Sequence, residues 1–195
     1  SYIYDVLNRL AQSTDEEGNA CTYTYDAAGN RTSYTDANGN KRTYTYDARN
    51  RLISVAGQND GSLTYAYTGT GRIAKVTDQE GTETDYQYDS MGRLIRMSDG
   101  LENSLTFTYD SLGRMLTQTD ANGNTTEFTY SPAGNLVKVK DAEEGETLYT
   151  YNGAGQVLTV TDPLGNTVSY EYDVLGHVTT VTDPMGGKIS LTYTA

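Results

Sequence analysis

A repeat of fixed length constrains this chain more than any other feature of its sequence. A tyrosine recurs every 21 residues, with no insertion or deletion between copies. A period of roughly 20–50 residues is typical of arrays built from one small structural unit. We therefore expect residues 1–195 to form a single array of about nine repeats, with a last partial copy. The anchoring tyrosines are Tyr4, Tyr25, Tyr46, Tyr67, Tyr88, Tyr109, Tyr130, Tyr151, Tyr172 and Tyr193.

The residues before each anchor show the two-residue alternation of a β-strand. An aromatic residue or leucine stands two positions before the anchor, and residues such as Cys21, Leu63 and Val168 stand four positions before it. The intervening positions are mostly Thr, Glu or Gln. This alternation predicts strands with one buried face. All 18 tyrosines except Tyr34 fall in the two columns at and before the anchor, so we expect them to line one shared side of a sheet.

Two turn signals divide each repeat into a hairpin. In Asp110–Gly113, the Asp can accept a backbone N–H bond and the Gly tolerates a positive φ. Asn8 and Asn50 replace this Gly, and Asn is the next residue most able to adopt a left-handed conformation. The second turn carries Asn-Gly-Asn or a related sequence, as in Asn122–Asn124. A return strand with alternating apolar residues connects the two turns.

Ten anchor strands and nine return strands predict an antiparallel meander of 19 strands. The fold class is all-β, with tandem 21-residue β-hairpin repeats that form one long curved or spiralling antiparallel sheet. Open sheets seldom exceed about ten strands without curling, and we expect the tyrosine-rich face to lie inside the curve. No segment has the apolar period of a helix. Unpaired strands at the ends of the array could pair with a second molecule.

Composition excludes several classes of function. A net charge of −12 opposes binding to a phosphate backbone, so we expect no nucleic-acid partner. No apolar run reaches the length of a membrane span, so we expect no membrane insertion. One cysteine rules out an internal disulfide framework and a multi-cysteine metal site. The chain begins without Met shortly before an anchor, and we expect it to be a segment of a longer array.

No residue stands out as catalytic, cofactor-binding or metal-ligating. Asp36–Asn40 and Asp120–Asn124 superficially resemble an acidic calcium loop, but both lack a closing bidentate Glu, and turn formation explains their composition. His177, the single histidine, occupies a column that elsewhere holds Arg, so we interpret it as a solvated variant. Cys21 stands in an inward column and is interpreted as a buried thiol. We therefore expect no catalytic residue, no metal site and no cofactor.

The run Tyr-Asp-x-x-Gly-Arg-Leu, followed by Thr-Asp and Gly-Asn, resembles the YD repeat of the Rhs family. Tyr88–Leu94 and Tyr109–Met115 match closely, and the match extends over the whole chain. Thr68, Ser131 and Asn152 replace the Asp, a change that we expect to remove the turn cap and to keep the spacing. The resemblance implies a hollow β-sheet shell, which in the toxins of this family encloses a C-terminal toxic domain.

The resemblance therefore implies a non-catalytic structural segment of a shell, in a secreted or cell-surface bacterial protein. Its partners would be the neighbouring YD repeats and the enclosed toxin domain. The alternative is a cell-surface module that binds carbohydrate or protein through its tyrosine columns. An enzyme would require turnover that depends on His177 or on one Asp. The arginines after the turn glycine, such as Arg93, are expected to pair with Asp residues of neighbouring repeats, and exposed pairs of this kind add little stability.

Overall fold

The computed structural model describes residues 1–58, 61–101 and 103–193, and within these ranges the chain forms nineteen β-strands and no helix. The described residues accordingly include no helix that could cross a membrane. The chain divides into two compact units, Ser1–Asn103 and Ser104–Ala195. We describe each unit separately.

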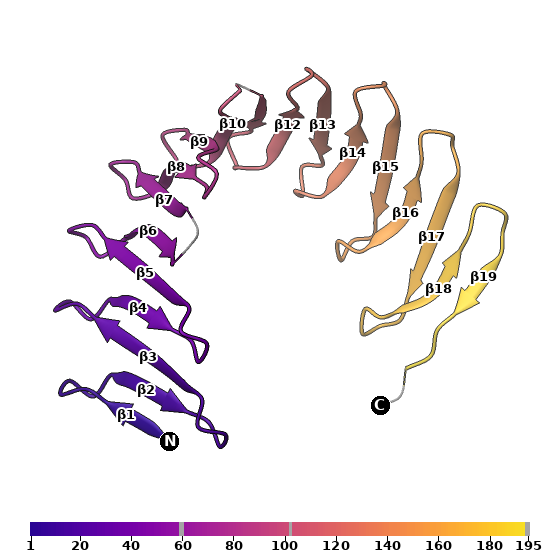
Figure 1. Ribbon diagram of the computed structural model, residues 1–195. Helices are drawn as coiled ribbons and strands as arrows, with labels where there is room; N and C mark the ends of the chain where they lie inside the picture. Colours follow the sequence, from indigo (N-terminus) through magenta and orange to yellow (C-terminus); the bar gives the residue numbers. More distant parts are fainter. Residues whose placement is uncertain (59–60, 102, 194–195) are drawn as a thin grey trace. The chain divides into compact units, whose positions relative to one another are not determined.

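The first unit is an antiparallel meander of ten strands, and each strand pairs with the next along the chain (Figure 1). Its strands are β1 (Tyr2–Tyr4), β2 (Leu10–Thr14), β3 (Ala20–Tyr25), β4 (Arg31–Thr35), β5 (Lys41–Tyr46), β6 (Leu52–Gly57), β7 (Ser62–Tyr67), β8 (Ile73–Thr77), β9 (Glu83–Tyr88) and β10 (Leu94–Asp99).

The second unit continues the same pattern with nine strands, again paired in chain order. The prediction of an all-β fold of tandem hairpins is confirmed, while a single array over residues 1–195 stays a prediction. The strands are β11 (Ser104–Tyr109), β12 (Met115–Thr119), β13 (Thr125–Tyr130), β14 (Leu136–Lys140), β15 (Glu146–Tyr151), β16 (Val157–Thr161), β17 (Thr167–Tyr172), β18 (Val178–Thr182) and β19 (Lys188–Ser190).

A β-bulge accompanies each anchor tyrosine from Tyr4 to Tyr172. In the β13–β14 hairpin, Thr129 faces Lys138 but Tyr130 faces Leu136, so Val137 is the extra residue of the return strand. The same shift recurs in the other hairpins that end on an anchor. Because a bulge increases the local twist and redirects a side chain, its repetition gives every anchor ring the same local setting.

The turns adopt the backbone conformation that the sequence predicts. Asn8 and Asn50, which replace the turn glycine, have φ of 61° and 59°. Gly29 has the same left-handed conformation, with a φ of 92°. Glu144 also takes it, with a φ of 67°, in a second turn where most repeats have glycine. The left-handed position is therefore a requirement of the hairpin and tolerates a side chain at some repeats.

The prediction of strands with one buried face overestimates burial. Among the described residues no hydrophobic side chain is fully buried, and Ser33 is the most enclosed residue at 6% exposure. The reason is that each unit is a single layer, so no second sheet or helix covers either face. Cys21, expected to be a buried thiol, is half-buried, and its Sγ lies 3.5 Å from the Tyr34 hydroxyl.

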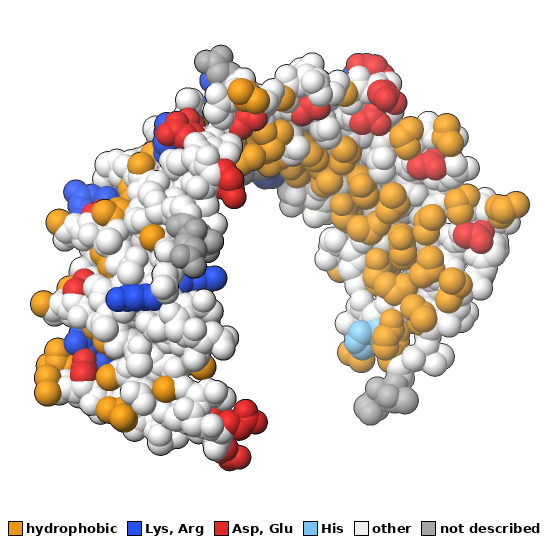
Figure 2. Space-filling view, viewed as in Figure 1, with side chains coloured by type: hydrophobic (Ala, Val, Ile, Leu, Met, Phe, Trp, Pro, Cys, Tyr) orange, Lys and Arg blue, Asp and Glu red, His pale blue; other side chains and the backbone are white. Residues whose placement is uncertain are grey.

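The two faces of the second unit differ in chemistry. Hydrophobic side chains gather on one face over its strands (Figure 2). The opposite face carries paired hydroxyls, for example those of Thr150 and Thr159 at 2.6 Å. Cross-strand neighbours on the hydrophobic face are Phe128 and Val139, Tyr149 and Val160, and Tyr170 and Val181.

Candidate functional site

The aspartate after each anchor closes the turn with one carboxylate. Asp110 Oδ1 accepts hydrogen bonds from the backbone N–H groups of Leu112 and Arg114, each at 2.9 Å. Its Oδ2 accepts a hydrogen bond from Arg114 Nε at 2.6 Å. The carboxylate therefore satisfies two turn donors and holds a guanidinium in place. The same arrangement occurs at Asp5, Asp47 and Asp89.

The guanidinium held in this way joins one repeat to the next. Arg51 Cζ lies 4.3 Å from the ring centroid of Tyr67, the anchor of the following repeat. Arg9 lies 4.6 Å from the ring of Tyr25 and also donates to the carbonyl oxygen of Asp26 at 2.9 Å. The expectation that these arginines pair with Asp of a neighbouring repeat is wrong. The ion pair lies within one repeat, because four residues separate the two side chains across the turn.

The anchor hydroxyl adds a second bond between repeats. Tyr67 Oη donates to the carbonyl oxygen of Leu52, 15 residues earlier, at 2.6 Å. Leu52 begins the return strand of the preceding repeat. Because the same contact recurs at further anchors, the rings that make it lie on one side of the sheet within each unit, as expected. These anchors include Tyr25 and Tyr46 in the first unit and Tyr151, Tyr172 and Tyr193 in the second.

We call the Asp and the residue four positions after it, together with the anchor Tyr of the next repeat, a clasp. Where the Asp is absent, another side chain caps the turn. Thr68 Oγ1, Ser131 Oγ and Asn152 Oδ1 each accept the backbone N–H of the residue four positions on, at 3.1, 3.2 and 3.0 Å. The expectation that these copies lose the cap is therefore wrong, since a hydroxyl or amide oxygen replaces one carboxylate oxygen.

Substitutions within the clasp come in chemically matched pairs. Asn152 replaces the Asp and faces Gln156, and their amides are 2.6 Å apart. Ser131 is also followed four positions on by an uncharged polar residue, Asn135, whose backbone N–H donates to Ser131 Oγ at 3.2 Å. Thr68 is the mismatch, because it faces Arg72 and leaves this guanidinium without an ion pair among the described residues. Sequence reasoning missed the matched pairs, although comparison of the two columns would have found them.

Hydrogen bonds within the turns lower the pKa values of the turn aspartates. Hydrogen bonds from the side chain and backbone of Arg51 lower the pKa of Asp47 to about 2. In the second turn, hydrogen bonds from Asn40 lower the pKa of Asp36 in the same direction. The Asp36 oxygens accept from the N–H groups of Asn38 and Asn40, which is the turn role rather than that of a calcium ligand. The described residues contain no cluster of three or more metal-ligating side chains.

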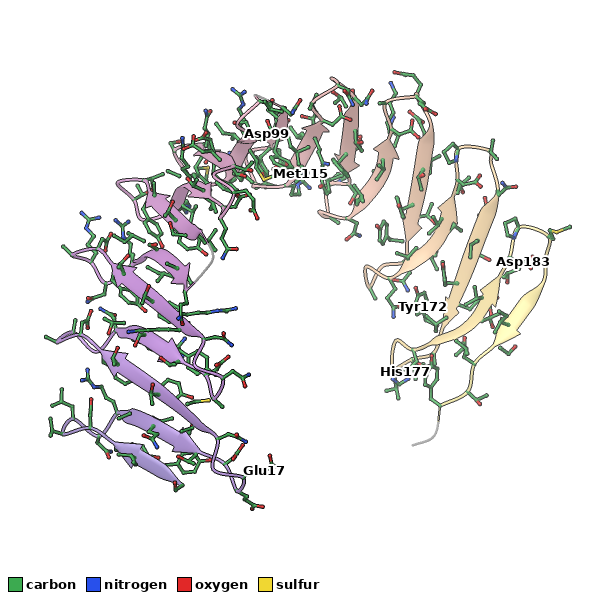
Figure 3. All side chains as sticks on the ribbon, viewed as in Figure 1. Glu17, Asp99, Met115, Tyr172, His177 and Asp183 are labelled. Carbon is green, nitrogen blue, oxygen red and sulfur yellow. The ribbon has the colours of Figure 1, made fainter. Side chains whose placement is uncertain are left out.

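His177 takes the place of arginine in the last described clasp. Its Nδ1 lies 3.0 Å from Asp173 Oδ2, and its ring stacks on Tyr193 with centroids 4.7 Å apart. Hydrogen bonding from the His177 backbone lowers the pKa of Asp173. His177 and Asp183, labelled in Figure 3, lie at opposite ends of β18. The structure thus places His177 among clasp residues, in contact with Asp173 and Tyr193.

Two family models match the chain. The Teneurin YD-shell family matches residues 1–135, and the RHS Repeat family matches residues 151–188. Among curated proteins no match is found.

Solved structures with the same fold are components of toxin complexes. They include TcdB2-TccC3 without its hypervariable C-terminal region (17% identity, TM-score 0.54) and TcdB2-TccC3-TEV (18%, 0.52). A third is the Photorhabdus luminescens Tc holotoxin pore (18%, 0.51). Each match covers 93% of this chain but only 12% of the other chain. At these identities the likeness establishes the fold.

Proposed function

Since the chain belongs to the Teneurin YD-shell family, we propose that it is a wall segment of a shell that encloses a toxin domain of the same protein. The observation that carries this proposal is the clasp. A sheet without a covering layer lacks a core on either side, and the clasps supply contacts from each repeat to the next. Such a sheet holds its shape while both faces stay available, one to the contents and one to solvent.

The similar structures support the proposal that the enclosed domain is a toxin. They are toxin-complex components, and one is described as lacking a hypervariable C-terminal region. We propose that a variable region of this kind is the enclosed cargo here. The segment itself acts without catalysis, as a barrier, in a secreted or cell-surface bacterial protein. Its partners are the neighbouring repeats and the cargo.

The test uses the full-length gene product that contains this segment. Trypsin is added to the intact protein and to a double variant, Arg51→Gln with Arg114→Gln, which loses two clasps. We expect the domain that follows the shell to resist digestion in the intact protein and to be cleaved in the double variant. Lys188→Gln, which removes an exposed positive charge outside any clasp, serves as the control. Equally fast digestion of that domain in all three proteins would exclude enclosure.

A second candidate function is a binding module for surface carbohydrate or protein. The observation that favours it is the incomplete burial of the tyrosine columns inside the array, where Tyr23, Tyr44 and Tyr65 each remain partly exposed. Glycan-array binding that disappears when these three tyrosines are replaced by alanine, with the fold retained, would support this function. Binding that persists in the triple variant would exclude the columns as the site.

A further inference from the structure

Arg72 differs from the other arginines of its column in its lack of a carboxylate. Arg9, Arg51, Arg93 and Arg114 each form an ion pair with the Asp four residues earlier. At Arg72 this residue is Thr68, whose hydroxyl accepts the backbone N–H of Arg72 and is also hydrogen-bonded to the Thr70 hydroxyl at 2.9 Å. The Arg72 guanidinium still lies beside the next anchor ring, but at 5.7 Å from the ring centroid of Tyr88 it is farther away than Arg51 is from Tyr67, at 4.3 Å. One repeat therefore has a positioned cation and lacks the anion.

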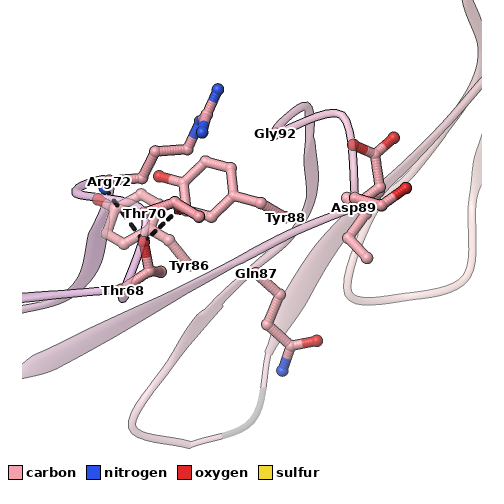
Figure 4. Close-up of a pocket in the computed structure, with 10 residues that line it drawn as sticks. Thr68, Thr70, Arg72, Tyr86, Gln87, Tyr88, Asp89 and Gly92 are labelled. Carbon is pink, nitrogen blue, oxygen red and sulfur yellow. Dashed lines mark hydrogen bonds between the residues drawn. The ribbon is translucent and has the colours of Figure 1, made fainter.

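A hollow of about 520 Å³ lies beside this guanidinium (Figure 4). Tyr86, Tyr88 and Ile95 supply an apolar part of its lining, and Arg72 supplies the charge. The guanidinium lies close against the next turn, because a Cβ on Gly92 would be 2.0 Å from Arg72 Nη2. A larger residue at this turn would displace the arginine, so the glycine leaves room for the charged group.

The other charged group of the hollow is already engaged. Asp89 lines it, but its Oδ2 accepts from Arg93 Nε at 2.7 Å and its Oδ1 accepts from the backbone of Met91 and Arg93. Its repulsion of a second anion is therefore reduced. The open guanidinium has two parallel N–H donors suited to a planar carboxylate.

We propose that this hollow binds the C-terminal carboxylate of a peptide whose last residue is apolar. The last residue of a peptide carries a carboxylate and a side chain on the same carbon atom. The carboxylate would pair with Arg72 in the place that Asp occupies in other repeats, while the side chain packs on Tyr86 and Ile95. The proposal goes beyond the shell function and does not depend on it.

The experiment titrates the 195-residue chain with the peptide acetyl-Ala-Ala-Val and follows amide chemical shifts by NMR. We expect a dissociation constant of about 1 mM, in line with one exposed ion pair and a small apolar contact. Arg72→Gln removes the positive charge and the paired guanidinium donors, and Thr68→Asp supplies the missing carboxylate from within the chain. Each should weaken binding by about two- to fivefold, as expected for the loss of one exposed ion pair. Lys188→Gln, which removes an equal charge from the second unit, should leave binding unchanged.

Thr68→Asp makes the result decisive, because it restores the clasp found in other repeats and should preserve the fold. Its thermal midpoint is measured alongside. The proposal is overturned if Thr68→Asp binds the peptide as tightly as the parent chain. It is also overturned if the C-terminal amide of the same peptide binds equally well, or if a peptide with an internal Glu and an amidated end binds more tightly. Binding of acetate as strong as that of the peptide would refute the apolar contact.

Discussion

Removal of one hydroxyl, in Tyr67→Phe, tests whether clasps hold the repeats together. The ring stays in place beside Arg51, at 4.3 Å, and only the hydrogen bond to the Leu52 carbonyl is lost. A hydrogen bond of this kind contributes about 0.5–1.5 kcal/mol net. In a unit of this size, a loss of about 1 kcal/mol lowers the melting temperature by about 4–8 °C. We therefore expect Tyr67→Phe to melt measurably earlier than the parent chain.

Circular dichroism during thermal and urea unfolding measures the change in free energy of unfolding. Tyr88→Phe is the matched control in the same unit, because no hydrogen bond of the Tyr88 hydroxyl occurs among the described residues. Its free energy of unfolding should differ from the parent by less than about 0.5 kcal/mol. Equal losses in the two variants would refute the assignment of stability to the hydroxyl-to-carbonyl bond.

Three further predictions concern the turns. The lowered pKa of Asp47 means that its contribution to stability is complete above about pH 4 and is lost as the pH falls toward about 2, because protonation breaks the bonds from Arg51. In urea midpoints measured across this range, Asp47→Asn should lose less stability than the parent. Gly29→Ala should cost about 1–2 kcal/mol because its φ is positive, whereas Gly69→Ala, where the φ is not positive and the site is open, should cost nothing. His177→Arg should stabilise the chain by about 0.2–1 kcal/mol, because a guanidinium can form the ion pair with the preceding Asp that the arginine-containing clasps have; an unchanged or lower urea midpoint would contradict this.

The sequence was sufficient to predict the hairpins but not the contacts that link them. Strands and turns depend on residues that are close together in the chain. The spacing of the tyrosines therefore predicts the strands, and Asn8 and Asn50 in place of glycine predict the left-handed turn position. The contact of Arg51 with Tyr67 crosses 16 residues and depends on the bulge, which no single column reveals.

Burial was overestimated for a related reason. Alternation of apolar and polar residues predicts which side of a strand is apolar, as Phe128 and Val139 confirm, but it does not say whether anything covers that side. A second layer depends on other segments, and the described residues of each unit supply none. The half-buried Cys21 follows from the same fact.

The clasp has a consequence for how such genes change over time. Each repeat of 21 residues contacts the repeat before it and the repeat after it. The same arginine-to-ring contact and hydroxyl-to-carbonyl hydrogen bond recur between neighbouring repeats. Unequal recombination that adds or deletes one whole unit recreates the same junction on both sides, so the product keeps its fold without compensating mutations. An insertion or deletion of a single codon between an arginine and the next anchor would instead separate that arginine from its ring. Selection would therefore permit changes in copy number and act against changes in spacing.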